Sequence, residues 1–149
     1  MICQSSPVGP LGANAAGGAI TELVWGTSGN LTNGPLHAQI CDEMTAYFTG
    51  NLKNFQTPVA PTGSPFQQKF YAALCAIPYG QTRTYGDLAQ ELGVSAQAIG
   101  QACGANPIAI IIPCHRVLAV NRLGGYSGMG GIEAKVALLK LEGAAGLLI

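Results

Sequence analysis

The fold is decided by residues 85–103, which read YGDLAQELGVSAQAIGQAC. A small residue where two helices cross (Ala89), a glycine at the turn (Gly93) and a branched residue that buries the second helix (Ile99) form the pattern of a helix-turn-helix. Ser95 is a good N-cap, so the helix that follows it is predicted to be the one that meets DNA. Helix-turn-helix units also serve as packing modules without nucleic acid, so this pattern alone leaves both functions open.

The chain before this unit predicts a small sheet and a helix. Residues 7–27 are punctuated by glycine and end in an imperfectly alternating apolar run, which indicates a hairpin around residues 16–18. Apolar residues near helical spacing over residues 34–50 predict a helix that covers one face of that sheet. The proline-containing segment 54–64 has few apolar side chains and reads as a linker.

Two further helices are expected in the second half. One opens at Pro65 and ends before Pro78, and an amphipathic helix covers residues 132–143. We therefore expect two domains, residues 1–62 and residues 63–149.

Residues 110–118 read IIIPCHRVL and place a thiol beside an imidazole. The β-branched run predicts a short buried strand whose end holds Cys114 next to His115. A free cysteine has a pKa of about 8.5, and a neighbouring histidine or helix N-terminus can lower it, so we expect Cys114 to be a nucleophile. A buried cysteine that merely precedes a histidine is the competing interpretation.

The composition limits the kinds of partner that the chain can bind. Only 9% of the 149 residues are charged, against about 25% in ordinary globular proteins. Residues 1–62 carry one basic residue against three acidic ones and residues 63–149 carry six against four, so the second half is the one that could approach a polyanion. With no signal-peptide pattern and no long apolar stretch, we expect a soluble, cytoplasmic protein.

The five cysteines favour a reducing compartment. Their number is odd and they form no CxxC pair, which argues against a disulfide framework and a zinc knuckle. Cys3, His37 and Cys41 could contribute to a metal site, but ligands without tight spacing are weak signals. No metal is therefore expected.

Six motifs, in this order, resemble those of the O6-alkylguanine-DNA alkyltransferases, also called methylated-DNA–protein-cysteine methyltransferases. They are Thr84-Tyr85, the helix-turn-helix, Asn106-Pro107, Pro113-Cys114-His115-Arg116, Gly125-Tyr126-Ser127 and Leu141-Glu142-Gly143. The resemblance covers the second half closely and the first half loosely. It implies an α/β (α+β) fold in which a small ribonuclease-H-like sheet-and-helix domain precedes a helical domain with a winged helix-turn-helix.

The resemblance also implies roles for individual residues. Cys114 is the alkyl acceptor, His115 the base acting through a water, and Glu142 the carboxylate that orients His115, while Asn106 organises the turn beneath the cysteine. The logic is that of a nucleophile, a base and an orienting group that favours the charged imidazole.

The other implied residues face the substrate. The pocket for the extruded base comprises Tyr85, which would help to protonate the leaving guanine, Tyr126 and Ser127. The residues expected to contact DNA are Ser95, Gln97, Ala98, Gln101 and Arg116.

The implied activity is single-turnover repair. The partner is DNA containing O6-alkylguanine, with O4-alkylthymine as a further candidate substrate, and the protein acts as a monomer without a metal or organic cofactor. Because a thioether has no carbonyl for water to attack, nothing in this chain could regenerate the thiol. The damaged nucleotide must first rotate out of the stack, at a cost of a few kcal/mol.

One position departs from the family pattern. Many relatives carry an arginine that fills the gap left by the extruded base, and the matching residue here is Gln97. Glutamine lacks the charge and planar fork of arginine, which predicts weaker DNA affinity and a shallower salt dependence.

Three other functions compete with transfer. An alkyltransferase-like sensor binds the lesion without repair, but such proteins usually lack the acceptor cysteine. A thiol hydrolase could use Cys114, His115 and Glu142, yet it needs an oxyanion hole that the sequence does not reveal. In a winged-helix regulator, Cys114 would only pack.

Overall fold

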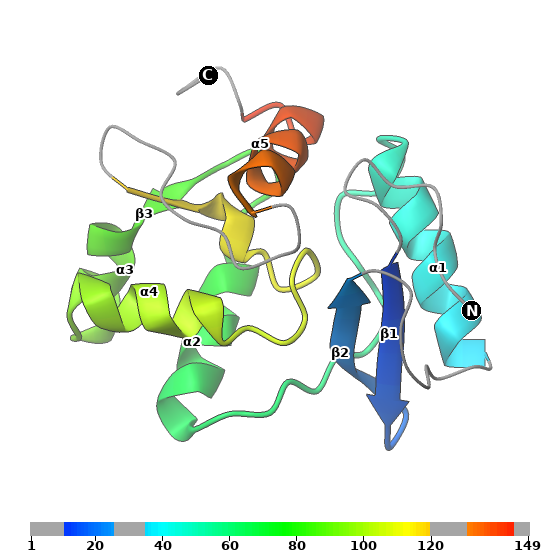
Figure 1. Ribbon diagram of the computed structural model, residues 1–149, viewed down its shortest axis with the longest axis horizontal. Coiled ribbons are helices and arrows are strands. Elements are labelled where there is room, and N and C mark those ends of the chain that lie inside the picture. The colour runs from blue at the N-terminus through cyan, green and yellow to red at the C-terminus, as the bar shows by residue number, and fades with distance from the viewer. Residues whose placement is uncertain (1–10, 26–34, 120–130, 145–149) are drawn as a thin grey trace.

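The computed structural model describes residues 11–25, 35–119 and 131–144 and shows a mixed α and β protein (Figure 1). The coarse fold class is thus confirmed. Its elements in chain order are β1 (Leu11–Ala16), β2 (Ala19–Trp25), α1 (Pro35–Phe48), α2 (Pro65–Cys75), β3 (Arg83–Thr84), α3 (Tyr85–Leu92), α4 (Ala96–Gly104), a 3-10 turn (Cys114–Arg116), β4 (Val117–Leu118) and α5 (Gly131–Leu141). Among the described residues, no helix combines the length and hydrophobicity needed to cross a membrane.

The hairpin predicted near the N-terminus is confirmed. Strands β1 and β2 pair antiparallel and are joined at Gly17 and Gly18, whose φ angles are 59° and 81°. A two-residue hairpin loop of type I′ requires positive φ at both positions, which glycine adopts without steric cost. Helix α1 packs beside this hairpin (Figure 1), with Ile40 and Met44 in the same core as Ile20.

The two helices expected on either side of Gly93 are also present. Helix α3 begins with a capping box in which Thr84 accepts from the Asp87 amide, and it ends at Gly93 with a φ of 70°. Ser95 caps α4 by accepting from the amide of Ala98 at 3.1 Å, as the sequence predicted. These caps fix where both helices begin and hence which side chains α4 exposes.

The strand predicted over residues 110–112 is wrong. The backbone turns there instead: the amide of Ile112 donates to the carbonyl of Ile108 at 2.9 Å, and Ile110 has a φ of 76°. A β-branched residue in the left-handed region is strained by about 1–3 kcal/mol and persists only where its surroundings hold it. Buried side chains on both Ile110 and Ile112 supply that restraint.

The two halves share one core. The amide of Leu23 in β2 donates to the carbonyl of Pro107 at 2.9 Å, and a single cluster of buried apolar residues runs from Ala13 to Leu138. The boundary between residues 62 and 63 stays a prediction. The shared core means that each half is positioned by the other.

Candidate active site

A compact turn carries Cys114. The Asn106 side chain spans it: Nδ2 donates to the carbonyl of Ile112 at 2.8 Å, and Oδ1 accepts from the amide of Ile108 at 3.0 Å. Pro113, with φ −83° and ψ 68°, forms an inverse γ-turn closed by the amide of Cys114 donating to Ile112 at 2.8 Å. The backbone on either side of the sulfur is therefore fixed.

A buried carboxylate lies behind this turn. Glu142, which follows α5, has a fully buried side chain that binds three neighbours. His115 Nε2 lies 2.8 Å from Oε2, Arg116 donates through Nε to Oε1 at 2.8 Å and through Nη2 to Oε2 at 2.9 Å, and the Tyr47 hydroxyl donates to Oε2 at 2.5 Å. Burial alone would raise the pKa of Glu142, but the hydrogen bonds from His115 and Arg116 outweigh it and lower the pKa to about 2.

The His115 imidazole is neutral in this setting. Complete burial lowers its pKa, against the opposing pull of Glu142, whose charge is already shared with Arg116. Because Nε2 faces the carboxylate, the proton of the neutral ring belongs on Nε2. Nδ1 is buried without a hydrogen-bond partner among the described residues. This tautomer leaves the Nδ1 lone pair available to accept a proton.

The pKa of Cys114 is not lowered, contrary to the effect expected of a neighbouring histidine. With 4% of its surface exposed, Cys114 is buried, and burial raises its pKa, opposed by the Asn106 side chain and the charge of Lys135. The expectation of a lowered pKa is wrong because loss of hydration outweighs these contacts. The Cys114 side chain is therefore a neutral thiol, and a base would have to remove its proton before the sulfur could act as a nucleophile.

Sequence reasoning missed Lys135. Its side chain is fully buried, and Nζ donates to the carbonyl of Val117 at 2.7 Å and lies 5.8 Å from the centroid of the Tyr85 ring. Burial lowers the pKa of Lys135 to about 8. A signal existed in the sequence, because Lys135 precedes Leu138 by three positions and Leu139 by four, the spacing of one helix face.

Comparison with known proteins identifies the family of the chain. Residues 65–144 match the family described as 6-O-methylguanine DNA methyltransferase, DNA binding domain. The chain belongs to this family. A Mycobacterium tuberculosis relative named methylated-DNA–protein-cysteine methyltransferase is 41% identical over 92% of this chain and 88% of its own length. A Methanosarcina acetivorans protein of the same name is 49% identical, over 68% of this chain and 66% of its own length.

Solved structures of the family agree with the fold. The crystal structure of Mycobacterium tuberculosis OGT in complex with DNA has a TM-score of 0.84 at 41% identity, covering 97% of this chain and 92% of that one. An O6-methylguanine DNA methyltransferase from Methanococcus jannaschii has a TM-score of 0.73 at 28% identity, covering 96% and 93%. The similarity to both solved structures extends through both halves of the chain.

The residues predicted to face the substrate of this methyltransferase-family protein are only partly described. Tyr85 is half-buried at the start of α3. Ser95, Gln97 and Gln101 are exposed and Ala98 is partly exposed along α4, on a surface that DNA could reach. Tyr126 and Ser127 lie outside the described residues.

The prediction that Arg116 contacts DNA is wrong. Only 7% of Arg116 is exposed, and all three of its side-chain nitrogens are engaged inside the protein, two with Glu142 and Nη1 with the carbonyl of Ile77 at 2.7 Å. A guanidinium that is buried and hydrogen-bonded in this way is not placed to bind a phosphate of DNA. Arg116 instead neutralises the buried carboxylate.

The weak metal signal gains no support. His37 and Cys41 lie one helical turn apart on α1 with 3.4 Å between Nε2 and Sγ, and Cys3 lies outside the described residues. Among the described residues no three histidine, cysteine or acidic side chains form a cluster that could hold a metal ion.

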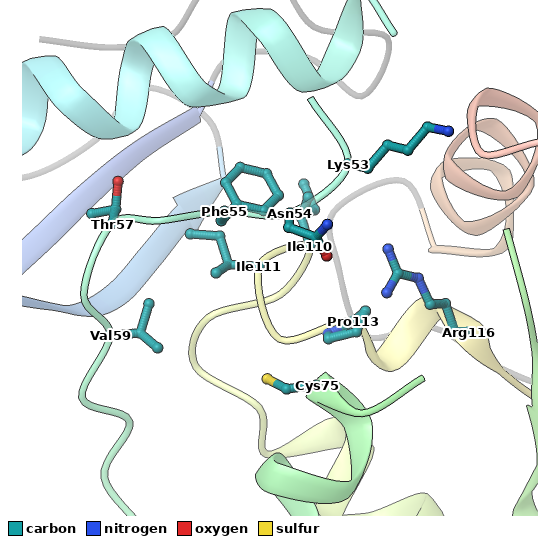
Figure 2. A pocket seen from close by; sticks show the side chains of 10 residues that line it. All are labelled: Lys53, Asn54, Phe55, Thr57, Val59, Cys75, Ile110, Ile111, Pro113 and Arg116. Carbon is teal, nitrogen blue, oxygen red and sulfur yellow. The ribbon is translucent and has the colours of Figure 1, made fainter. Parts of the chain in front are cut away.

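A cavity of about 170 Å³ adjoins the Cys114 turn. Figure 2 shows Phe55 beside Ile110, with Pro113 and Arg116 on the segment that carries Cys114. Cys114, His115 and Tyr85 do not line this cavity, so it is separate from the pocket predicted for the extruded base. The cavity lies between residues 53–59 and the turn that carries Cys114.

Proposed function

We propose that this chain repairs DNA by direct reversal, moving the alkyl group of O6-alkylguanine onto Cys114 once per molecule. The arrangement that carries the proposal is the buried thiol on a fixed turn, followed directly by a histidine that is held by Glu142. Relatives named for the same chemistry, at 41% identity over most of the chain, support it. The acceptor cysteine disfavours a sensor that binds lesions without repairing them.

The reaction begins with a proton transfer. Neutral Cys114 gives its proton to Nδ1 of His115 through a water, because adjacent Cys and His side chains rarely point at each other directly. The resulting imidazolium is stabilised by Glu142, which is ionised throughout. Sulfur then attacks the alkyl carbon, a C–S bond forms, and the bond from that carbon to O6 breaks.

Protonation of the leaving guanine completes the balance. Tyr85 donates its hydroxyl proton to the departing guanine and becomes a phenolate. The proton that His115 took from Cys114 then returns through solvent to Tyr85, so both residues regain their starting protonation states. The positive charge of Lys135, near Cys114, favours the thiolate as it forms. No proton is gained or lost overall, and Cys114 ends as a thioether.

The finer features of the fold serve this reaction. We infer that β1, β2 and α1 belong to a ribonuclease-H-like domain and that α3 and α4 form a winged helix-turn-helix. In this arrangement α4 enters the major or minor groove, and the damaged base rotates into a pocket beside Cys114. We also infer that the protein acts as a monomer in the cytoplasm.

Intact-mass analysis tests the function. After incubation with a duplex containing O6-methylguanine, the protein is expected to gain the mass of one methyl group, located on Cys114 by peptide mapping. A duplex with ordinary guanine at the same position is the control and should leave the mass unchanged. An unaltered mass after exposure to the lesion would refute the proposed repair activity.

Gln97→Arg is expected to strengthen binding to lesion duplex. Gln97 is exposed on α4, so a longer cationic side chain there can enter the duplex without disturbing the core. At moderate salt we expect a gain of roughly 3- to 10-fold in affinity, with a slope of log affinity against log salt steeper by about one. Fluorescence anisotropy across salt concentrations measures both, and Gln97→Ala is the neutral comparison. An arginine variant with unchanged or weaker binding contradicts the gap-filling role.

A further inference from the structure

Tyr47 connects the N-terminal segment to the carboxylate behind Cys114. It lies on the last turn of α1, and its hydroxyl donates to Oε2 of Glu142 at 2.5 Å across 95 positions of sequence. Oε2 is the same oxygen that faces Nε2 of His115. A residue of the hairpin-and-helix segment thus shares an acceptor atom with the proposed base.

The Tyr47 ring is held on several sides. Its side chain is fully buried, and its centroid lies 5.3 Å from those of Phe48 and Phe55 and 6.2 Å from that of Tyr79. Burial, followed by the charge of Glu142, raises the pKa of the Tyr47 phenol far above its ordinary value, so the hydroxyl stays a neutral donor at every working pH. A fixed ring with a permanent donor restricts where the carboxylate can sit.

Arg116 and Tyr47 make different contributions to holding Glu142. Arg116 grips both oxygens of the carboxylate and neutralises its charge. Tyr47 adds no charge, but it approaches Oε2 from a different element, α1, whereas Arg116 and His115 belong to one 3-10 turn. Without Tyr47, the carboxylate would be held only by residues of that one 3-10 turn and could move together with it. The hydrogen bond from Tyr47 ties the carboxylate to α1 as well.

We propose that Tyr47 is a positioning residue for alkyl transfer: by fixing Oε2 of Glu142 it sets the orientation and basicity of His115, so that the N-terminal segment completes the reactive site. This inference rests on the proposed function. It assigns the N-terminal segment a direct part in the chemistry, in addition to its contribution to the shared core.

Tyr47→Phe tests the proposal because it removes one hydroxyl and keeps the ring. In single-turnover reactions with O6-methylguanine duplex, the transfer rate constant is expected to fall roughly 10-fold. With one donor fewer on Oε2, more of the carboxylate charge acts on His115 and favours the imidazolium, so the acid limb of the pH–rate profile should move to higher pH. Affinity for the lesion duplex should remain within about twofold of wild type.

Tyr79→Phe is the matched control. Its hydroxyl donates to the backbone carbonyl of Leu141 at 3.2 Å, beside Glu142 in sequence, and its ring packs in the same aromatic group. We expect this variant to keep the wild-type rate constant and pH profile, even if both variants melt at a lower temperature. The rate constant is a property of the folded molecules, so partial unfolding lowers the reaction amplitude and leaves the rate constant readable.

The outcomes separate the two proposals. A wild-type protein that gains no methyl mass overturns the proposed function itself. An active wild type whose Tyr47→Phe variant keeps the same rate constant and pH profile overturns the positioning role alone. Equal slowing by Tyr79→Phe would also overturn it, because general weakening of the aromatic group would then explain the loss.

Discussion

Cys114→Ser is expected to abolish methyl transfer while leaving recognition of the lesion intact. A serine hydroxyl is far less acidic than a thiol, so His115 can no longer generate a useful nucleophile in this buried site. Removing the nucleophile of such a group typically costs roughly 10⁴-fold or more in rate, which places the variant below detection by intact mass. Since serine has nearly the same shape as cysteine, the Asn106 turn beneath it should persist, and affinity for lesion duplex should stay within about threefold of wild type.

Cys75→Ser controls for the loss of a thiol as such. Cys75 ends α2, is exposed, and lines the cavity behind the Cys114 turn (Figure 2). We expect this variant to accept one methyl group at the wild-type rate. Methylation of the Cys114→Ser protein would place the acceptor elsewhere and contradict the assignment of Cys114.

Local signals in the sequence predicted the elements well where a short-range rule determines the backbone. Gly17-Gly18 specified the hairpin loop, and Ser95 specified the first turn of α4, because each acts on its immediate neighbours. The apolar pattern missed the turn at residues 110–112 for the same reason, whereas the family resemblance implied a turn organised by Asn106. Three β-branched residues favour a strand locally, whereas Asn106 and Pro113 impose a turn through contacts that no local rule includes.

In the cluster around Cys114 as well, the motifs identified some residues, whereas contacts between distant residues decided the others. The motifs placed Cys114, His115 and Glu142 in one site, and the structure brings the last two within 2.8 Å. The family resemblance implied that Arg116 contacts DNA. In the structure Arg116 binds the buried Glu142 instead, because an ionised carboxylate removed from water needs a charged partner. Tyr47 fits the core pattern of α1, and its partner lies 95 residues away, so helical spacing could not reveal the hydrogen bond.

Glu142→Gln is expected to slow methyl transfer by about 10²–10⁴-fold. The substitution keeps the volume but replaces one carboxylate oxygen with an amide NH₂, which donates where His115, Arg116 and Tyr47 also donate. The NH₂ opposes Arg116 Nε if it replaces Oε1, and it opposes His115 and Tyr47 if it replaces Oε2. In either orientation the imidazolium that forms when His115 takes the proton of Cys114 has no carboxylate to stabilise it. Single-turnover kinetics on lesion duplex measure the loss. The exposed Glu133→Gln, on the helix that precedes Glu142, is the control that should leave the rate unchanged.

Stability against pH gives an independent measure of the same carboxylate. Because the folded pKa of Glu142 is about 2 against an ordinary 4.5, its charge favours the folded state above about pH 4.5, by roughly 3 kcal/mol, and this stabilisation is lost as the pH falls toward 2. The lowered pKa of His115 acts in the same direction, since the unfolded chain takes up a proton first as the pH falls below 6.5. Glu142→Gln should therefore cost about 3–5 kcal/mol in the free energy of unfolding at pH 7 and less at pH 3. Denaturant titrations at both pH values measure the difference. A variant as stable as wild type at pH 7, with wild-type transfer kinetics, would show that the buried carboxylate neither holds the fold nor orients the base.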